Sequence, residues 1–174
     1  MSKKKNEISE WYVDHSEAIF KFIVMMIHDY QKAEDLTQET FIKAYKFYDS
    51  FQHNSSPKTW LFRIAHNVTV DYLRKNKPLF FIKNLFLTID VSPLPEEVVE
   101  IKEGVKEIYK LLQCLKSSYR EVIILRKIKS FSIKETSEIL GWSESKVKST
   151  LARALVEFEE VLLKEGYDYE KKMG

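Results

Sequence analysis

The chain contains few of the residues that strand-rich or disulfide-bonded proteins need. Its 174 residues include one cysteine, four glycines and four prolines. A single cysteine excludes an intramolecular disulfide, and so few turn-forming residues leave little room for the many tight turns of a β protein. Alternation of apolar and polar residues is also scarce, so we expect an all-α fold. Cys114 falls in an apolar helical run, where we expect it to be a small buried hydrophobe.

Other absences narrow the function. No apolar run approaches the roughly 18 residues that span a bilayer, and Lys3 to Lys5 precede polar residues instead of the apolar core of a signal peptide. Metal-ligand spacings such as HExxH or paired cysteines are missing, as is a glycine-rich phosphate loop. We therefore expect a cytoplasmic, soluble protein that is not an enzyme and has no cofactor, metal or small-molecule substrate. The four histidines are scattered: His15, His28, His53 and His66.

Positive charge is concentrated in two segments of an otherwise nearly neutral chain, whose net charge is +2. Residues 116–153 hold nine lysines and arginines against four glutamates, and residues 58–77 hold five against Asp71 alone. Two separate basic segments indicate two places where the protein meets phosphate.

Residues 131–155 have the pattern of a DNA-recognising helix-turn-helix: a helix, a turn at Gly141, and a second helix capped by Ser143. At about 100° per residue, one side of the second helix is apolar and should pack on the first helix. Its members are Val147, Leu151, Ala154, Leu155 and Phe158, opposite Ile133, Ile139 and Leu140.

The opposite side of that second helix is a strip of small residues, Ser145, Ser149 and Ala152. Lys148 borders the strip on one side, and Lys146 and Arg153 border it on the other. Such a strip can approach the floor of the major groove while its cations meet the phosphate walls. The alternative is an ordinary amphipathic surface helix with solvated lysines, and the turn at Gly141 favours DNA binding.

Two small helical domains flank a segment without helical periodicity. We predict domains at 1–77 and 97–174 and a flexible linker at 78–96, which contains Pro78, Pro93 and Pro95. Residues 79–89 of the linker are unusually apolar, and we expect them to pack on a domain or to bind a protein partner. A membrane-surface helix is less favoured because this segment has no basic face.

The helix expected near residues 32–48 has two distinct sides. Its core side comprises Ala33, Leu36, Thr37, Thr40, Phe41, Ala44 and Tyr48. The other side carries Asp35, Gln38, Glu39, Ile42 and Lys46. Solvation explains the charges but not Ile42, so either a solvated surface or a docking surface remains open.

A further helix should begin with Ser56 as its cap and Pro57 in its first turn. Its two apolar sides leave one polar strip, which could contact base edges and phosphates. Equally, the amide of the strip could satisfy a backbone group and an arginine could pair with an acid. The strip comprises Arg63, Asn67, Arg74 and Lys77.

Three stretches occur in an order and spacing that resemble the extracytoplasmic-function sigma factors of the bacterial sigma-70 family. They are AEDLTQETFIKAY (33–45), KTWLFRIAHNVTVDYLRK (58–75) and SIKETSEILGWSESKVKSTLARA (132–154). The resemblance covers nearly the whole chain. It implies a factor that binds core RNA polymerase at its clamp helices and flap, directs it to promoters and assists melting.

The resemblance also assigns residues. The DLTQETF segment implies polymerase binding by Asp35, Gln38, Glu39 and Ile42. Contact with the minus-10 element is implied for the loop 52–58, with Lys58, and for Arg63, Asn67 and Arg74. Contact with the minus-35 element is implied for Ser145, Lys146, Lys148, Ser149 and Arg153. Members of the family are often held by an anti-sigma factor, in some cases membrane-anchored, so we expect one here.

The chain departs from the family pattern within the helix-turn-helix. Members often show Thr-Val-Lys-Ser-Arg where this chain has Lys146 to Thr150, so one usual cation is missing and another is gained one turn earlier. Trp142 stands where a smaller apolar residue is common, and Thr136 and Ser137 replace apolar residues. We expect a shifted promoter preference. A stand-alone helix-turn-helix regulator acting as a dimer is the rival interpretation.

Overall fold

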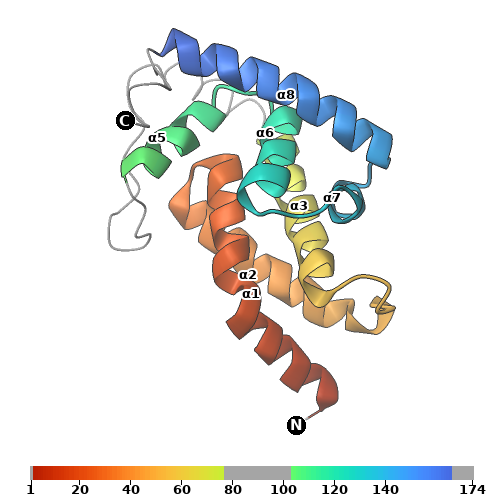
Figure 1. Ribbon diagram of the computed structural model, residues 1–174. Coiled ribbons are helices and arrows are strands. Elements are labelled where there is room, and N and C mark those ends of the chain that lie inside the picture. Colours follow the sequence, from red (N-terminus) through yellow and green to blue (C-terminus); the bar gives the residue numbers. More distant parts are fainter. Residues whose placement is uncertain (1, 77–102, 166–174) are drawn as a thin grey trace.

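The computed structural model describes residues 2–76 and 103–165, and the regular elements in these two segments are all helical (Figure 1). The first segment contains α1 (Lys3–Ile27), α2 (Tyr30–Lys46), the 3-10 helix η1 (Tyr48–Ser50) and α3 (Pro57–Lys75). The second contains α5 (Glu103–Leu112), α6 (Ser117–Ile123), the π-helical stretch η2 (Ile124–Ile128), α7 (Ile133–Leu140) and α8 (Glu144–Lys164). The predicted all-α class is confirmed. The predicted linker 78–96, its apolar stretch 79–89 and Lys77 lie outside the described residues.

Helix α1 begins at Lys3, and its C-terminal end is enclosed. Residues 22–27 are buried without interruption. Six consecutive residues cover every side of an α-helix, so this end of α1 is surrounded. Its neighbours are α2, α3 and, from the second segment, α6.

Side chains cap the next two helices: Asp29, which the sequence did not lead us to expect, caps α2, and Ser56 caps α3 as predicted. The Asp29 carboxylate accepts a hydrogen bond from the backbone N–H of Lys32 at 3.0 Å, which caps α2. Ser56 accepts from the backbone N–H of Thr59 at 3.1 Å, and Pro57 occupies the first position of α3. Side-chain caps of this kind stabilise a helix by about 1 kcal/mol. The two caps thus set the first residues of α2 and α3.

Helices α5 to α8 form a second packed group. Arg120 of α6 links the C-terminal ends of α5 and α1 through hydrogen bonds to their backbone oxygens. Its guanidinium donates to the backbone oxygen of Leu112 at 3.0 Å and of Leu115 at 2.9 Å, at the end of α5. It also donates to the oxygen of Met26 near the end of α1 at 2.5 Å. Burial lowers the pKa of Arg120 to about 10. Several carbonyl oxygens thus compensate one buried cation.

The two described segments share one continuous apolar core, and we call the contacts between them the junction. Helix α3 packs on α7. Just before α7, Phe131 packs against Phe62 of α3, with their ring centres 4.9 Å apart in an edge-to-face arrangement. His66 of α3 lies 2.9 Å from the carboxylate of Glu121 of α6, and both side chains are buried. In Figure 1, α3 passes behind α6 and beside α7. The two predicted domains are packed together in this structure.

Cys114 is exposed, so the prediction that it is buried was wrong. Helix α5 ends at Leu112, and Cys114 lies in the following turn, where its N–H donates to the oxygen of Leu111. The helical period therefore stops before it reaches the cysteine. Partial desolvation is the main cause that raises the pKa of the thiol, and Glu165 adds to it.

Candidate nucleic-acid and polymerase-binding surfaces

The helix-turn-helix forms through the turn that the sequence indicates. Gly141 ends α7 with a φ of 69°, in the left-handed region that glycine adopts without steric penalty. The next N–H, from Trp142, donates to the oxygen of Ser137 at 3.1 Å. Ser143 then caps α8 by accepting from the N–H of Lys146 at 3.1 Å. The turn sets the angle between α7 and α8.

The predicted strip on α8 is exposed along its length, and we call it the α8 strip. Its members are Ser145, Lys146, Lys148, Ser149, Ala152 and Arg153. On the opposite side, Val147 and Ala154 are fully buried, and Leu151 and Phe158 pack on the core. Leu155 was expected in this apolar side but is 36% exposed, because it lies at the border of the buried face.

The three cations of the α8 strip lack a carboxylate partner among the described side chains. Lys146, Lys148 and Arg153 form no salt bridge with any side chain among residues 2–76 and 103–165. The ammonium group of Lys146 lies 4.4 Å from the centre of the Trp142 ring, within the range of a cation–π contact. The strip therefore presents positive charge that no described carboxylate neutralises.

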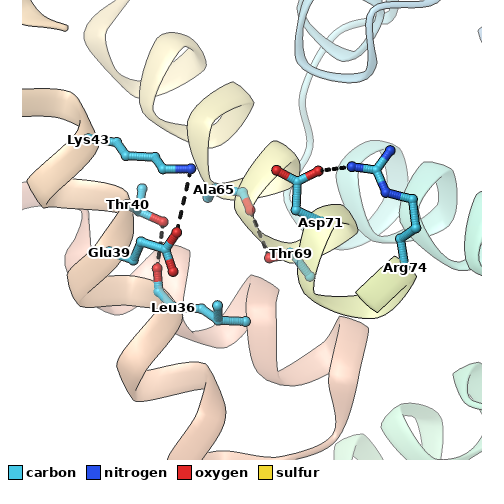
Figure 2. Close-up of polar contacts among 8 residues, drawn as sticks. All are labelled: Leu36, Glu39, Thr40, Lys43, Ala65, Thr69, Asp71 and Arg74. Atoms are coloured by element: carbon cyan, nitrogen blue, oxygen red, sulfur yellow. Dashed lines mark hydrogen bonds and ion pairs between the residues drawn. The ribbon is translucent and has the colours of Figure 1, made fainter. Parts of the chain in front are cut away.

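The predicted strip on α3 is exposed at Arg63, Asn67 and Arg74, and we call it the α3 strip. Unlike the cations of α8, Arg74 is paired, since its guanidinium donates to the carboxylate of Asp71 at 2.6 Å (Figure 2). Lys58, at the start of the helix, lies 5.2 Å from the ring centre of Phe131 across the junction. Arg63 and Asn67 therefore form the open part of the strip.

The loop before α3 rests on an aromatic cluster that the sequence analysis did not identify. Phe51 is buried and lies 5.0 Å from Trp60 and 5.5 Å from Trp11, measured between ring centres. The exposed ring of His53 lies 4.4 Å from Phe51, and the φ of His53 is 57°, a left-handed value uncommon outside glycine. The signal in the sequence was the pair Phe51 and Trp60, two aromatic residues on either side of the polar loop. The cluster fixes the base of the loop.

The predicted two-sided character of α2 is confirmed. The residues expected on its core side are buried from Ala33 to Ala44, while Asp35, Gln38, Glu39 and Ile42 are exposed. The helix ends at Lys46, earlier than expected, so the partly exposed Tyr48 lies in η1 and not in α2. Ile42 is 67% exposed, the feature that solvation alone does not explain. Glu39 pairs with Lys43 at 3.5 Å along the helix (Figure 2). We call Asp35, Gln38, Glu39 and Ile42 the α2 face.

Lysines also gather at the junction. Burial is the main cause that lowers the pKa of Lys129 to about 8, and the positive charges of Lys21 and Lys58 lower it further. Lys21 pairs with Glu17 at 2.9 Å. Sequence patterns did not indicate this group, because its members come from α1, from the start of α3 and from the segment after η2.

Two family models match the chain in succession. One describes sigma-70 region 2 and matches residues 11–78, and the other describes sigma-70 region 4 and matches residues 106–158. Together they cover more than half of the chain, in the order that the α2 face, the α3 strip and the helix-turn-helix follow. The chain therefore belongs to the sigma-70 family.

Comparison with individual relatives narrows the class. The chain is 37% identical over 150 residues to the ECF RNA polymerase sigma factor SigX of Bacillus subtilis, covering 83% of this chain and 77% of the relative. It is 33% identical to the RNA polymerase sigma factor YlaC of the same organism, covering 93% and 95%. The protein is thus an extracytoplasmic-function sigma factor, which directs RNA polymerase to promoters, and the stand-alone regulator is not favoured.

Solved structures have the same fold. The sigma factor RpoE, in its complex with the anti-sigma factor NepR from Bartonella quintana, is 27% identical, with a TM-score of 0.73 over 90% of this chain and 96% of that one. CnrH, in complex with the cytosolic domain of CnrY, is 22% identical, with a TM-score of 0.68 over 91% and 88%. Among the described residues, no helix is both long and apolar enough to cross a bilayer.

Proposed function

We propose that the α8 strip recognises the minus-35 element of the promoter. The observation that carries this proposal is an exposed small-residue strip bordered by three cations without carboxylate partners among the described residues. Small side chains let a helix approach the base edges closely, and the bordering cations replace counterions on the phosphates. The capped start of α8 places Ser145, Lys146 and Ser149 in the first two turns of the recognition helix.

The α3 strip and the loop before it are proposed to bind the minus-10 element and to assist its melting. Arg63 and Asn67 are open to contact bases and phosphates, with Lys58 and Arg74 at the two ends of the helix. The exposed ring of His53, supported from below by Phe51, offers a surface on which an extruded base can stack. Stacking on an aromatic side chain contributes about 1 to 3 kcal/mol per base and offsets part of the unstacking cost.

The α2 face is proposed to bind the clamp helices of core RNA polymerase. The C-terminal predicted domain, 97–174, is proposed to bind the flap. A strongly exposed isoleucine among carboxylates and an amide is the composition expected of a small docking site with one apolar anchor. Replacing Ile42 with glutamate should weaken binding to core enzyme by at least about tenfold, as loss of an interface anchor does. Val13 of α1 is 80% exposed and lies outside the α2 face, so Val13→Glu is the matched control.

The packed arrangement must open when both promoter elements are bound. The two elements are about 25 base pairs apart, which is roughly 85 Å of B-form DNA at about 3.4 Å per base pair. A compact chain of this size has a radius of gyration of about 15 Å and is roughly 40 Å across. Separation at the junction, with domains at 1–77 and 97–174 joined by 78–96, allows α3 and α8 to reach their elements together. The ranges of the two family models support these boundaries.

An anti-sigma factor is proposed to hold the packed arrangement. The solved relatives RpoE and CnrH are both bound to partner proteins, named as the anti-sigma factor NepR and the cytosolic domain of CnrY. An anchored partner of that kind would place this protein at the cytoplasmic side of a membrane. The protein itself is proposed to act in the cytoplasm without catalysing a reaction.

The decisive experiment is run-off transcription from a genomic promoter library with purified bacterial core RNA polymerase, in the presence and absence of this protein. We expect new discrete start sites only when both components are present, and their upstream sequences should align into two elements. If the protein binds DNA tightly alone and never redirects core enzyme, the proposed roles of the α2 face and the α3 strip are wrong.

A further inference from the structure

Two residues that depart from the usual family pattern lie in contact with each other. Trp142 occupies the turn of the helix-turn-helix, and Lys146 lies in the first turn of α8. The ammonium nitrogen of Lys146 is 4.4 Å from the centre of the Trp142 ring. Cation–π attraction acts within about 6 Å, and tryptophan is the aromatic side chain that attracts cations most strongly.

The tryptophan ring is a fixed platform. Its backbone N–H is bonded to the oxygen of Ser137, directly after the left-handed Gly141. Its side chain is partly buried and packs against the core shared by α7 and α8. The backbone of Lys146 is held as well, because its N–H donates to the capping oxygen of Ser143. With both backbones held, the contact restricts a lysine side chain that would otherwise sample many rotamers.

We propose that Trp142 is a positioning residue for promoter recognition, and that its ring holds the Lys146 ammonium beside the α8 strip for contact with a phosphate of the upstream element. The proposal rests on the role proposed above for the α8 strip. A lysine that is already positioned loses less rotamer freedom when it binds, so more of its electrostatic attraction remains as affinity. Lys148, across the strip, has no aromatic platform among the described residues and serves as the internal comparison.

A purely structural role for Trp142 predicts something different. If the ring only fills the turn, replacing it should weaken DNA binding equally whether or not residue 146 carries a charge. A positioning role requires that the effect disappear when that charge is removed. Coupling between the two substitutions, together with the salt dependence of binding, separates the two roles.

The test is a double-mutant cycle with full-length protein assembled with core RNA polymerase. The probe is a promoter duplex that the wild-type holoenzyme selects in the run-off experiment, and affinity is measured across a range of salt concentrations. Lys146→Gln should lower the slope of log affinity against log salt by about one. Trp142→Leu should weaken binding by about two- to fivefold and reduce the slope in part. In the Lys146→Gln background, Trp142→Leu should change affinity by less than about 1.5-fold.

Two controls keep the outcomes distinct. Trp142→Phe retains a ring, so it should restore most of the lost affinity. In the Lys148→Gln background, Trp142→Leu should have its full effect. Equal effects of Trp142→Leu in the wild-type and Lys146→Gln backgrounds would overturn the proposal, as would tighter binding by Trp142→Leu. If Lys146→Gln alone changes neither affinity nor slope, Lys146 does not contact phosphate and the inference is wrong. The role proposed for the rest of the α8 strip is then decided by Arg153→Ala and Lys148→Gln.

A loss of folding in Trp142→Leu would be visible as a lost thermal transition of the free protein. The cycle is then completed with Trp142→Phe, which keeps the platform but has a weaker attraction for the cation. A smaller coupling of the same sign to Lys146→Gln supports positioning. Additive effects in that cycle overturn it.

Discussion

The α3 strip and the α8 strip are both predicted to bind DNA, but they lie on helices with different surroundings. Helix α3 is covered on two sides and carries the junction, where its fully buried Phe62 packs against Phe131. Helix α8 buries one side and leaves the other open. A substitution on the buried sides of α3 should therefore lower both the stability of the fold and that of the junction. A substitution on the α8 strip should change only the exposed surface.

The strips also differ in electrostatics. Arg74 of the α3 strip already has a carboxylate partner, and Lys58 lies near the partly buried Lys129, whose pKa it lowers. The cations of the α8 strip have no carboxylate partner among the described side chains. We therefore expect α8 to dominate the salt dependence of promoter binding. On α3, Arg74 must separate from Asp71 before it reaches phosphate.

The largest expected effect is on the buried side of α3, at the junction. Phe62→Ala removes a fully buried ring that packs against Phe131 across the junction, so it should lower the free energy of unfolding by about 3 to 5 kcal/mol. Leu155→Ala on α8 is the control, since Leu155 is 36% exposed, and its effect should stay under about 1 kcal/mol. Both values follow from urea denaturation monitored by circular dichroism. Similar losses in the two variants would contradict the asymmetry between the helices.

A second substitution tests whether the junction is closed in solution. Glu121→Leu leaves the buried His66 Nε2 without its carboxylate partner, which should destabilise the protein by about 1 to 3 kcal/mol. His66→Leu combined with Glu121→Leu should cost less than the sum of the single substitutions, because neither polar group is then left unpaired. Additive values from urea denaturation would mean that the two segments do not contact each other through this pair in the free protein.

The electrostatic difference predicts unequal salt effects in the holoenzyme. Arg153→Ala should weaken promoter binding and lower the salt slope by about one. Arg74→Ala should change the slope less, because Asp71 already neutralises that arginine. Removing the partner with Asp71→Ala should strengthen binding and make it more salt-dependent. An unchanged slope in Arg153→Ala would count against phosphate contact there.

The last comparison concerns pH, at the group of lysines beside the start of α3. The pKa of Lys129 is lowered from 10.5 to about 8 in the folded protein, so the unfolded chain binds more protons between those values. Stability conferred through this group therefore rises with pH across that window. Tyr72 and Tyr109, whose pKa values burial raises, act in the opposite direction above about pH 10.

Lys129→Met isolates that contribution. The difference in unfolding free energy between the variant and the wild type should favour the variant at pH 7 and shrink as the pH rises from about 8 to 10. Urea denaturation at several pH values gives the comparison directly. A difference independent of pH would show that Lys129 is solvated in the folded protein.

Local patterns predicted the features that depend on neighbouring residues. Gly141 and Ser143 fixed the helix-turn-helix, because a left-handed residue and a capping hydroxyl act within one turn of chain. Ser56 and Pro57 marked the start of α3 in the same way. Helical periodicity placed Ile42 on the exposed side of α2 and Ser145 on the α8 strip. The roles of these residues in binding remain predictions.

Only the tertiary structure decided how the two halves meet. His66 and Glu121 are 55 residues apart in the chain, and Arg120 and Met26 are 94 apart. No periodicity relates such positions, so the buried polar contacts of the junction were not predictable. The burial of Cys114 was predicted wrongly because α5 ends in a turn after Leu112, although the apolar helical pattern continues in the sequence. The sequence by itself thus determined the helices, their caps and their exposed strips, since these follow from steric and hydrogen-bonding preferences within a few residues. The junction depended on burial of surfaces from distant parts of the chain.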